Sequence, residues 1–265
     1  MSQINLEGHV AILTGGSRGI GAATVQLLAA AGARVIFSYA RRREAAAAVV
    51  AACPRGQVFS LRADVARPES AERLVRAAVA RWGRLDIAIN NAGYWNPESR
   101  PLEQLDAARW DAMLAINLRG AYALARAAAR QMRRQRPRAG NSKSFPFAVR
   151  GRILLVSSTA GQRGEAFHSH YGAAKAGVIG LVRGLAPELA PEILINCLAP
   201  GWVATEMAAP ALRHARQRRA VLQKIPLGRI GAPEEIAGGL LFLCSPWANF
   251  MTGSVLSMNG GAVLA

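Results

Sequence analysis

The sequence predicts a doubly wound α/β fold, in which a parallel sheet of about seven strands is covered by helices on both faces. Short apolar segments with strand composition alternate with longer alanine-rich segments whose apolar residues recur at a helical period. Each short segment ends in small or turn-forming residues. Alternating strands and helices require crossover connections, which make the strands parallel and cover both faces of the sheet.

The strand-like segments follow one another at regular intervals along the chain: 9–16, 33–40, 57–65, 85–93, 151–158, 193–201 and 254–258. Helical periodicity lies between them, in segments 20–31, 69–81, 105–132 and 173–185. No linker-like stretch divides the sequence, so we expect a single domain over residues 1–265. Ligands of such a fold bind beyond the carboxyl ends of the strands, where the chemically interesting residues should therefore lie.

Composition limits the classes of protein to consider. A chain of 265 residues with 51% hydrophobic content can bury a sizeable core. The first residues, "MSQINLEGHVAIL", contain no basic segment followed by a long apolar run, and no later segment reaches membrane-spanning length. We therefore expect a cytoplasmic protein without a membrane partner. Cys53, Cys197 and Cys244 lie far apart without CxxC spacing, which predicts free thiols rather than disulfides or a zinc site.

The formal net charge of +17 raises the question of a polyanionic partner. Only Lys143, Lys175 and Lys224 among the 33 basic residues are lysines, and the arginines are mostly scattered. This skew, together with the alanine content, is typical of a base-composition bias. Because the sequence contains no nucleic-acid recognition motif, the charge alone does not favour nucleic-acid binding.

The first strand is followed by a glycine-rich turn, "TGGSRGIG" at 14–21, that opens the first helix. Gly15, Gly19 and Gly21 allow a tight turn and a close approach to a ligand, and the helix amino terminus offers free N–H groups to a pyrophosphate. A glycine-rich turn by itself also occurs as an ordinary strand-to-helix connection. The strand before it and the helix after it favour a dinucleotide site.

The end of the second strand, "FSYARRR", indicates which dinucleotide is preferred, because it lacks the acidic residue that usually holds a ribose 2′-hydroxyl. Arg18 and Arg41 instead supply positive charge suited to a 2′-phosphate, which favours NADP(H) over NAD(H). Arg42 and Arg43 are equally compatible with a solvated helix start. Asp64, after the third strand, could accept a hydrogen bond from an adenine amino group or cap the next turn.

The segment "YGAAK" places Tyr171 and Lys175 four residues apart, on one face of a predicted helix and about one turn from each other. A tyrosine with its ordinary pKa near 10 is poorly matched to neutral pH, and an adjacent cation would stabilise its phenolate. Taken alone, such a pair is more often an exposed helical pair than a catalytic one.

Several motifs in order resemble the short-chain dehydrogenase/reductase family, and within it the reductases that act on 3-oxoacyl thioesters with NADPH. The resemblance covers nearly the whole chain and rests on "TGGSRGIG", "NNAG" at 90–93, "INLRG" at 116–120, Ser158, "YGAAK", "APGWVATEM" at 199–207 and "TGSVLSMNGG" at 252–261.

The resemblance implies roles for four residues. Ser158 would hold the substrate carbonyl oxygen, and Tyr171 would act as the general acid. Lys175 would provide a positive field for the phenolate, together with the oxidised nicotinamide ring, and Asn117 would position a water that joins Lys175 to solvent. The cofactor contacts that we expect are Gly15, Ser17, Arg18, Gly19, Ile20, Gly21, Tyr39, Arg41, Asp64, Val65, Asn91, Ala92, Gly93, Tyr171, Lys175, Pro200, Gly201, Val203 and Thr205.

Two segments outside these motifs are candidates for contacts with substrate or partner. Residues 206–225 predict a mobile, basic helical lid, which would suit an acidic acyl carrier protein but is equally compatible with a solvated arginine-rich face. Residues 133–151 form a longer basic insertion than the family usually has, and we expect an exposed loop that could carry a partner contact. The resemblance also implies a homotetramer.

His168 and His170, in "HSHY", are not accompanied by a further ligand at metal-binding spacing, so no metal site is expected. We expect these histidines to line the substrate entrance or the surface.

The leading hypothesis is an NADPH-dependent reductase that converts a ketone, best a 3-oxoacyl thioester, into a secondary alcohol. A second is an NAD(P)-dependent dehydrogenase of a sugar, steroid or other secondary alcohol, which the same residues would serve. A third, favoured only by charge, is a non-enzymatic nucleotide-sensing or nucleic-acid-binding module.

Overall fold

The predicted doubly wound fold is confirmed by a computed structural model, which describes residues 4–137 and 148–264. Parallel strands form one sheet in the order β3-β2-β1-β4-β5-β6-β7, and each lies within one of the predicted strand segments. The strands are β1 (Val10–Thr14), β2 (Arg34–Tyr39), β3 (Val58–Arg62), β4 (Ile87–Asn90), β5 (Gly151–Val156), β6 (Ile193–Pro200) and β7 (Val255–Met258).

Helices connect the strands, and the predicted helical segments agree with them closely. The segment 105–132 is divided, because a π-helical turn, η2 (Ala115–Arg119), separates two α-helices. The α-helices are α1 (Gly19–Ala30), α2 (Arg43–Ala51), α3 (Glu69–Trp82), α4 (Ala107–Leu114), α5 (Gly120–Arg134), α6 (Thr159–Arg163), α7 (Ser169–Leu189), α8 (Ala209–Leu212), α9 (Ala215–Leu222) and α10 (Pro233–Cys244), with short 3₁₀ turns η1 (Leu102–Gln104) and η3 (Pro246–Ala248). Within the described ranges, no helix has both the length and the hydrophobicity needed to cross a membrane.

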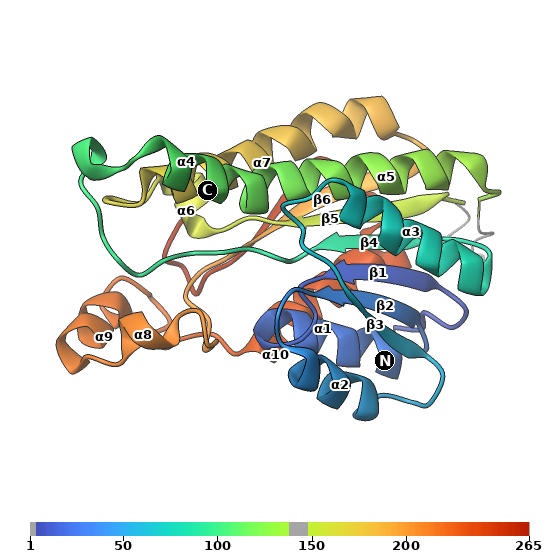
Figure 1. Ribbon diagram of the computed structural model, residues 1–265, viewed down its shortest axis with the longest axis horizontal. Coiled ribbons are helices and arrows are strands. Elements are labelled where there is room, and N and C mark those ends of the chain that lie inside the picture. The colour runs from blue at the N-terminus through green and yellow to red at the C-terminus, as the bar shows by residue number, and fades with distance from the viewer. Residues whose placement is uncertain (1–3, 138–147, 265) are drawn as a thin grey trace.

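The two faces of the sheet have separate cores. In β1, Val10 and Ile12 face one core while Ala11 and Leu13 face the other, as the period of two along a strand requires. Helices α3, α5 and α7 cover one face, and α1, α2 and α10 cover the other (Figure 1). Because both faces are covered, the open carboxyl edge of the sheet is where a ligand can enter.

The chain changes direction at β1. It runs outward through β2 and β3 and then returns to β4 on the other side of β1. The turns after β1 and β4 therefore diverge and leave a crevice at the carboxyl ends of these strands. Helices α8 and α9, which form most of the predicted lid, project from the body beyond this edge (Figure 1).

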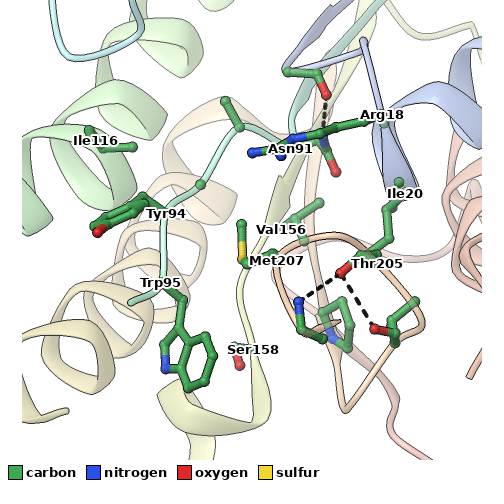
Figure 2. Close-up of a pocket in the computed structure, with 18 of the residues that line it drawn as sticks. Arg18, Ile20, Asn91, Tyr94, Trp95, Ile116, Val156, Ser158, Thr205 and Met207 are labelled. Atoms are coloured by element: carbon green, nitrogen blue, oxygen red, sulfur yellow. Dashed lines mark hydrogen bonds between the residues drawn. The ribbon is translucent and has the colours of Figure 1, made fainter. Parts of the chain in front are cut away.

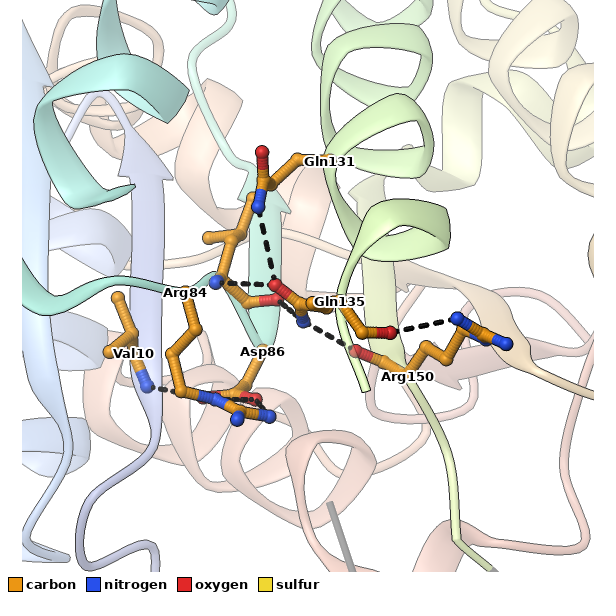
Figure 3. A network of polar contacts seen from close by, with 7 residues as sticks. Val10, Arg84, Asp86, Gln131, Gln135 and Arg150 are labelled. Carbon is orange, nitrogen blue, oxygen red and sulfur yellow. Dashed lines mark hydrogen bonds and ion pairs between the residues drawn. The ribbon is translucent and has the colours of Figure 1, made fainter. Parts of the chain in front are cut away.

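The opposite, amino edge of the sheet is held by a polar network (Figure 3). Asp86 accepts hydrogen bonds from the Val10 amide at 2.9 Å and from the Arg84 guanidinium at 2.7 Å. The side-chain amide of Gln135 bonds the backbone N–H of Leu85 at 3.0 Å and its carbonyl at 2.5 Å. It also donates to the carbonyl of Arg150 at 2.8 Å. These contacts tie the start of β4 to the end of α5 and the start of β5.

This network fixes where the predicted loop 133–151 leaves and rejoins the body. Helix α5 continues to Arg134, so the first two residues of the predicted loop are helical, and Gly151 already belongs to β5. Residues 138–147 lie outside the described part of the chain. Both described ends lie at the amino edge of the sheet, across the body from the carboxyl edge.

We predict that Gln135→Ala lowers the free energy of unfolding by about 1–3 kcal/mol, because it leaves buried backbone groups of Leu85 without their partners. Gln131→Ala is the matched control, since the Gln131 amide only approaches Gln135 at 3.5 Å. Urea denaturation of both variants measures the difference. Equal stability of the two variants would contradict the role given to Gln135.

Candidate active site

A cavity of about 890 Å³ follows the carboxyl edge of the sheet. All of the predicted cofactor contacts line it, from the turn after β1 to Thr205 after β6. Ser158 lines it too, whereas Asn117 is not among the described residues of its wall. Figure 2 shows Arg18 and Asn91 in the upper part of this cavity and Trp95 and Ser158 in the lower part. One cavity thus brings the predicted nucleotide residues and the predicted chemical residues together.

The glycine-rich turn has the backbone that its sequence predicts. Gly15 and Gly19 have φ angles of 72° and 51°, a region that side chains other than glycine rarely occupy. A Cβ on Gly21 would lie 2.1 Å from the Gly15 carbonyl oxygen, so α1 can approach the turn only without a side chain there. The turn is a preformed concave backbone at a helix amino terminus, as a pyrophosphate requires.

Asn91 and Thr14 join the turns after β1 and β4. The Asn91 amide donates to the carbonyls of Thr14 at 3.1 Å and Gly15 at 3.0 Å. The Thr14 hydroxyl accepts from the backbone N–H groups of Asn91 at 3.1 Å and Ala92 at 3.0 Å. Asn91 therefore fixes the shape of the glycine turn, in addition to lining the cavity. The sequence motifs did not predict that Asn91 would hold the glycine turn in shape.

Arginines gather where the turns after β1 and β2 meet the cavity. Arg18, Arg41 and Arg42 all line it, so Arg42 is more than part of a solvated helix start. Glu206 binds two of them, with its Oε2 atom 2.8 Å from Arg18 Nη1 and 3.0 Å from Arg42 Nη2. Asp64 lines the cavity and also accepts a hydrogen bond from the Ala66 N–H at 3.0 Å, which realises the predicted cap.

Tyr171 and Lys175 face each other on α7, with Lys175 Nζ 5.9 Å from the centre of the Tyr171 ring. Both residues are buried, and both line the cavity, so they are not an exposed helical pair. The Lys175 ammonium donates to the carbonyl of Val156, the last residue of β5, at 2.9 Å. The end of β5 therefore sets the position of the cation beside the phenol.

Burial controls the acidity of both groups. Desolvation raises the pKa of Tyr171 to about 12, although a hydrogen bond with Ser158 lowers it, and the nearby Glu165 carboxylate raises it further. Desolvation lowers the pKa of Lys175 to about 8. Burial therefore makes this phenol less acidic than an ordinary tyrosine, which opposes the acidifying effect expected from Lys175 and the nicotinamide ring together. With this pKa, Tyr171 is protonated throughout the physiological range.

Ser158 serves both the structure and the cavity. It caps α6, where its hydroxyl oxygen accepts from the Ala160 N–H at 3.1 Å. Its hydroxyl also bonds Tyr171, which is the contact that lowers the tyrosine pKa. The capping role alone would explain this serine, but its position beside Tyr171 at the cavity adds a polar group where a substrate oxygen could bind.

Asn117 lies in η2, fully buried. Its amide donates to the Tyr94 carbonyl at 2.9 Å, and its Oδ1 atom accepts from the Tyr94 N–H at 3.1 Å. A Cβ on Gly93 would lie 2.9 Å from Asn117 Oδ1 and 3.3 Å from Lys175 Nζ. Asn117 thus holds the chain after β4 in place, with only a glycine between its amide and the lysine.

The lower part of the cavity has an aromatic wall that the sequence motifs did not indicate. The Trp95 ring stacks on His168 at 5.2 Å and meets Trp202 edge to face at 5.8 Å. His168 and His170 are both buried, which rules out the surface alternative of the expectation, and neither is among the described residues that line the cavity. Glu165 also lines the cavity, and desolvation raises its pKa. Trp95, Glu165 and Trp202 come from loops after β4, β5 and β6, and they meet only in the folded chain.

The wall chemistry fits a phosphorylated dinucleotide. The glycine turn leaves room for a backbone approach to phosphate, and the paired guanidiniums of Arg18 and Arg42 already hold one carboxylate oxygen between them. A metal has no comparable support, since the described residues contain no group of three or more His, Cys, Asp or Glu side chains that could hold one.

Comparison with known proteins agrees with this geometry. A family described as Enoyl-(Acyl carrier protein) reductase matches residues 15–263. The 3-oxoacyl-[acyl-carrier-protein] reductase of Synechocystis is 35% identical over 263 residues, which are 98% of each chain. That of Vibrio cholerae is 37% identical over 259 residues, 97% of this chain and 98% of the relative.

Solved structures give the same result. A short-chain dehydrogenase/reductase, glucose/ribitol dehydrogenase, from Brucella melitensis superposes over 100% of both chains with a TM-score of 0.87 and 30% identity. A short-chain dehydrogenase/reductase from Serratia marcescens covers 97% of this chain and 98% of its own, with a TM-score of 0.85 and 36% identity.

We predict that Gly21→Ala weakens binding of a reduced dinucleotide at least about tenfold, because its Cβ would overlap the Gly15 carbonyl and open the turn. Gly180→Ala in α7 is the control, since a Cβ there would meet no described atom within 4 Å. Cofactor fluorescence measures binding, and thermal unfolding shows whether each variant is folded. Unchanged binding by folded Gly21→Ala protein would refute the role given to the glycine-rich turn.

Proposed function

Because the chain belongs to the short-chain dehydrogenase/reductase family, we propose that it uses NADPH to reduce a ketone, a 3-oxoacyl thioester, to a secondary alcohol. The observation that carries this proposal is the single cavity lined by the glycine turn, Ser158, Tyr171 and Lys175. The names of the Synechocystis and Vibrio cholerae relatives support the substrate class.

In this proposal the turn after β1 holds the pyrophosphate, and Arg18 and Arg41 hold the 2′-phosphate. Pro200, Gly201, Val203 and Thr205 line the cavity where the nicotinamide end would lie. When bound, NADPH supplies the hydride that the carbonyl carbon accepts.

The protein's own part is to bind the carbonyl oxygen and to protonate it. Ser158 and Tyr171 present hydroxyl groups to the same region of the cavity. The alkoxide formed by reduction is roughly as basic as hydroxide, and therefore more basic than a phenolate. A tyrosine with a pKa of about 12 therefore gives up its proton favourably. Burial that keeps Tyr171 protonated suits it to act as an acid in the direction of reduction.

Lys175 stabilises the phenolate that Tyr171 becomes. Its ammonium donates a hydrogen bond to the Val156 carbonyl. This bond keeps Lys175 Nζ 5.9 Å from the centre of the Tyr171 ring. With a pKa of about 8, it is largely charged at neutral pH. Asn117, next to Gly93 and close to the lysine, is the residue that we propose to position a water for return of the proton.

An acidic acyl carrier protein is the partner that we propose to deliver the substrate. The predicted lid carries Arg213, Arg216, Arg218 and Arg219, all exposed, beside the carboxyl edge of the sheet. Opposite charges speed association of protein partners. The described ends of the basic loop lie at the other edge, so a contact there would serve a different partner surface. A homotetramer in the cytoplasm remains our proposal for assembly and location.

Two other activities are compatible with these residues. The same set would oxidise a secondary alcohol of a sugar, as the name of the Brucella melitensis neighbour suggests. The description of the matched family points instead to reduction of an enoyl thioester. Hydride addition to a ketone forms an alkoxide, which is a stronger base than the enolate formed from an enoyl thioester, so the ketone has the greater need of the Tyr171 proton.

One panel of assays separates these activities. Oxidation of NADPH and of NADH is followed with acetoacetyl and crotonyl thioesters, and reduction of NADP⁺ with ribitol and glucose. We expect turnover of the acetoacetyl thioester with NADPH. A preference for crotonyl thioester, for a sugar alcohol or for NADH would overturn the corresponding part of the proposal. Steeply salt-dependent DNA binding without turnover would favour the non-enzymatic alternative.

We predict that Tyr171→Phe abolishes ketone reduction but leaves NADPH binding measurable, because it removes only the acidic hydroxyl. Tyr122→Phe changes an exposed tyrosine on α5 and serves as the matched control. Steady-state turnover and cofactor fluorescence measure the two properties separately. Turnover retained by Tyr171→Phe would defeat the assignment.

The pKa of Lys175 predicts the pH dependence of reduction. Burial lowers this pKa from 10.5 to about 8, so the ammonium is lost as pH rises through 8, whereas Tyr171 keeps its proton until about pH 12. We expect kcat/KM for ketone reduction to be level below pH 8 and to fall above it, by up to about tenfold per pH unit. A value that stays level to pH 10 would be inconsistent with this role for Lys175.

A further inference from the structure

Glu206 occupies an anion site made by two arginines from different parts of the chain. Arg18 belongs to the turn after β1, and Arg42 precedes α2, after β2. A single oxygen of Glu206, Oε2, lies 2.8 Å from Arg18 Nη1 and 3.0 Å from Arg42 Nη2. Glu206 itself comes from the loop after β6 and is the first residue of the predicted lid. The carboxylate therefore bridges the cavity from one wall to the other.

Two guanidiniums that converge on one oxygen atom form a site for an oxyanion. Arg41, also on the cavity wall, adds positive charge beside it. The loops after β1 and β2 are where a dinucleotide in this fold presents its adenosine ribose. A 2′-phosphate there would need the hydrogen-bond donors that Glu206 now uses.

We infer that Glu206 is an internal competitor for the 2′-phosphate and thereby sets how strongly the protein prefers NADPH to NADH. This inference rests on the proposed use of NADPH. A phosphate monoester carries nearly two negative charges and three acceptor oxygens, whereas Glu206 offers one charge and two oxygens. The phosphate can therefore displace the carboxylate from both arginines. NADH offers a hydroxyl at the same position and leaves the ion pairs intact.

The competition has a defined direction and a modest size. All three side chains are about half exposed, so each ion pair contributes little to stability. Removing the charge of Glu206 frees both guanidiniums before the nucleotide arrives. Ligands with a 2′-phosphate should then bind more tightly, by about three- to tenfold, and ligands without it should bind as before.

The test compares Glu206→Gln with Glu192→Gln, a matched control in which the lost carboxylate pairs with Arg150 at 2.6 Å, at the other edge of the sheet. Isothermal titration measures the dissociation constants of NADPH, NADH, 2′,5′-ADP and ADP for both variants and for the unchanged protein. The two smaller nucleotides report on the arginine site without any contribution from the nicotinamide or from turnover.

We expect Glu206→Gln to bind NADPH and 2′,5′-ADP about three- to tenfold more tightly, with the constants for NADH and ADP within about twofold and Glu192→Gln unchanged. Unchanged or weaker binding of 2′,5′-ADP by Glu206→Gln would overturn the inference, as would equal tightening of ADP. If the unchanged protein binds ADP more tightly than 2′,5′-ADP, the proposed cofactor itself is wrong. The two failures are thus distinguished by which protein shows them.

Discussion

The buried positive charge of Lys175 is the feature on which the chemistry of this cavity depends. An ammonium group removed from water is costly unless it is hydrogen-bonded, and the Val156 carbonyl at 2.9 Å supplies such a bond. Gly93 leaves the space beside it, because a Cβ there would lie 3.3 Å from the ammonium. The Lys175 ammonium is thus surrounded by three segments: the end of β5, the chain after β4 and the η2 turn. The cost of burying the ammonium appears as a pKa that desolvation lowers from 10.5 to about 8.

The fold places the cavity residues at the carboxyl edge of the sheet and the polar network that joins the strands at the amino edge. At the carboxyl edge, loops bring charged and aromatic side chains around an open cavity. At the amino edge, Gln135 and Asp86 bond backbone groups of neighbouring strands and leave little freedom there (Figure 3). Parallel strands make this division possible, because all their carboxyl ends lie on one side. The insertion 133–151 begins and ends at the amino edge, away from the cavity, so a change in its length need not disturb the cavity.

Local sequence patterns were enough to predict the strands, the main helices and the glycine turn. These elements depend on periodicity and on single residues such as Gly15, whose φ angle of 72° only glycine adopts readily. Contacts between distant loops were beyond such patterns: Glu206 meets Arg18 across 188 residues, and Trp95 meets Trp202 in the same way. The burial that raises the pKa of Tyr171 to about 12 was also beyond such patterns. Spacing showed the lysine beside it, but the degree of burial belongs to the folded chain.

The central claim is that Tyr171 remains an acid while Lys175 beside it titrates near neutral pH. Nuclear magnetic resonance of the protein with labelled lysine and tyrosine tests this directly, through the titration midpoints of the two side chains without cofactor. The account predicts a midpoint of about 8 for Lys175 and a phenol still protonated at pH 10. A Lys175 that titrates near its ordinary 10.5, or a Tyr171 that ionises below pH 9, would contradict it.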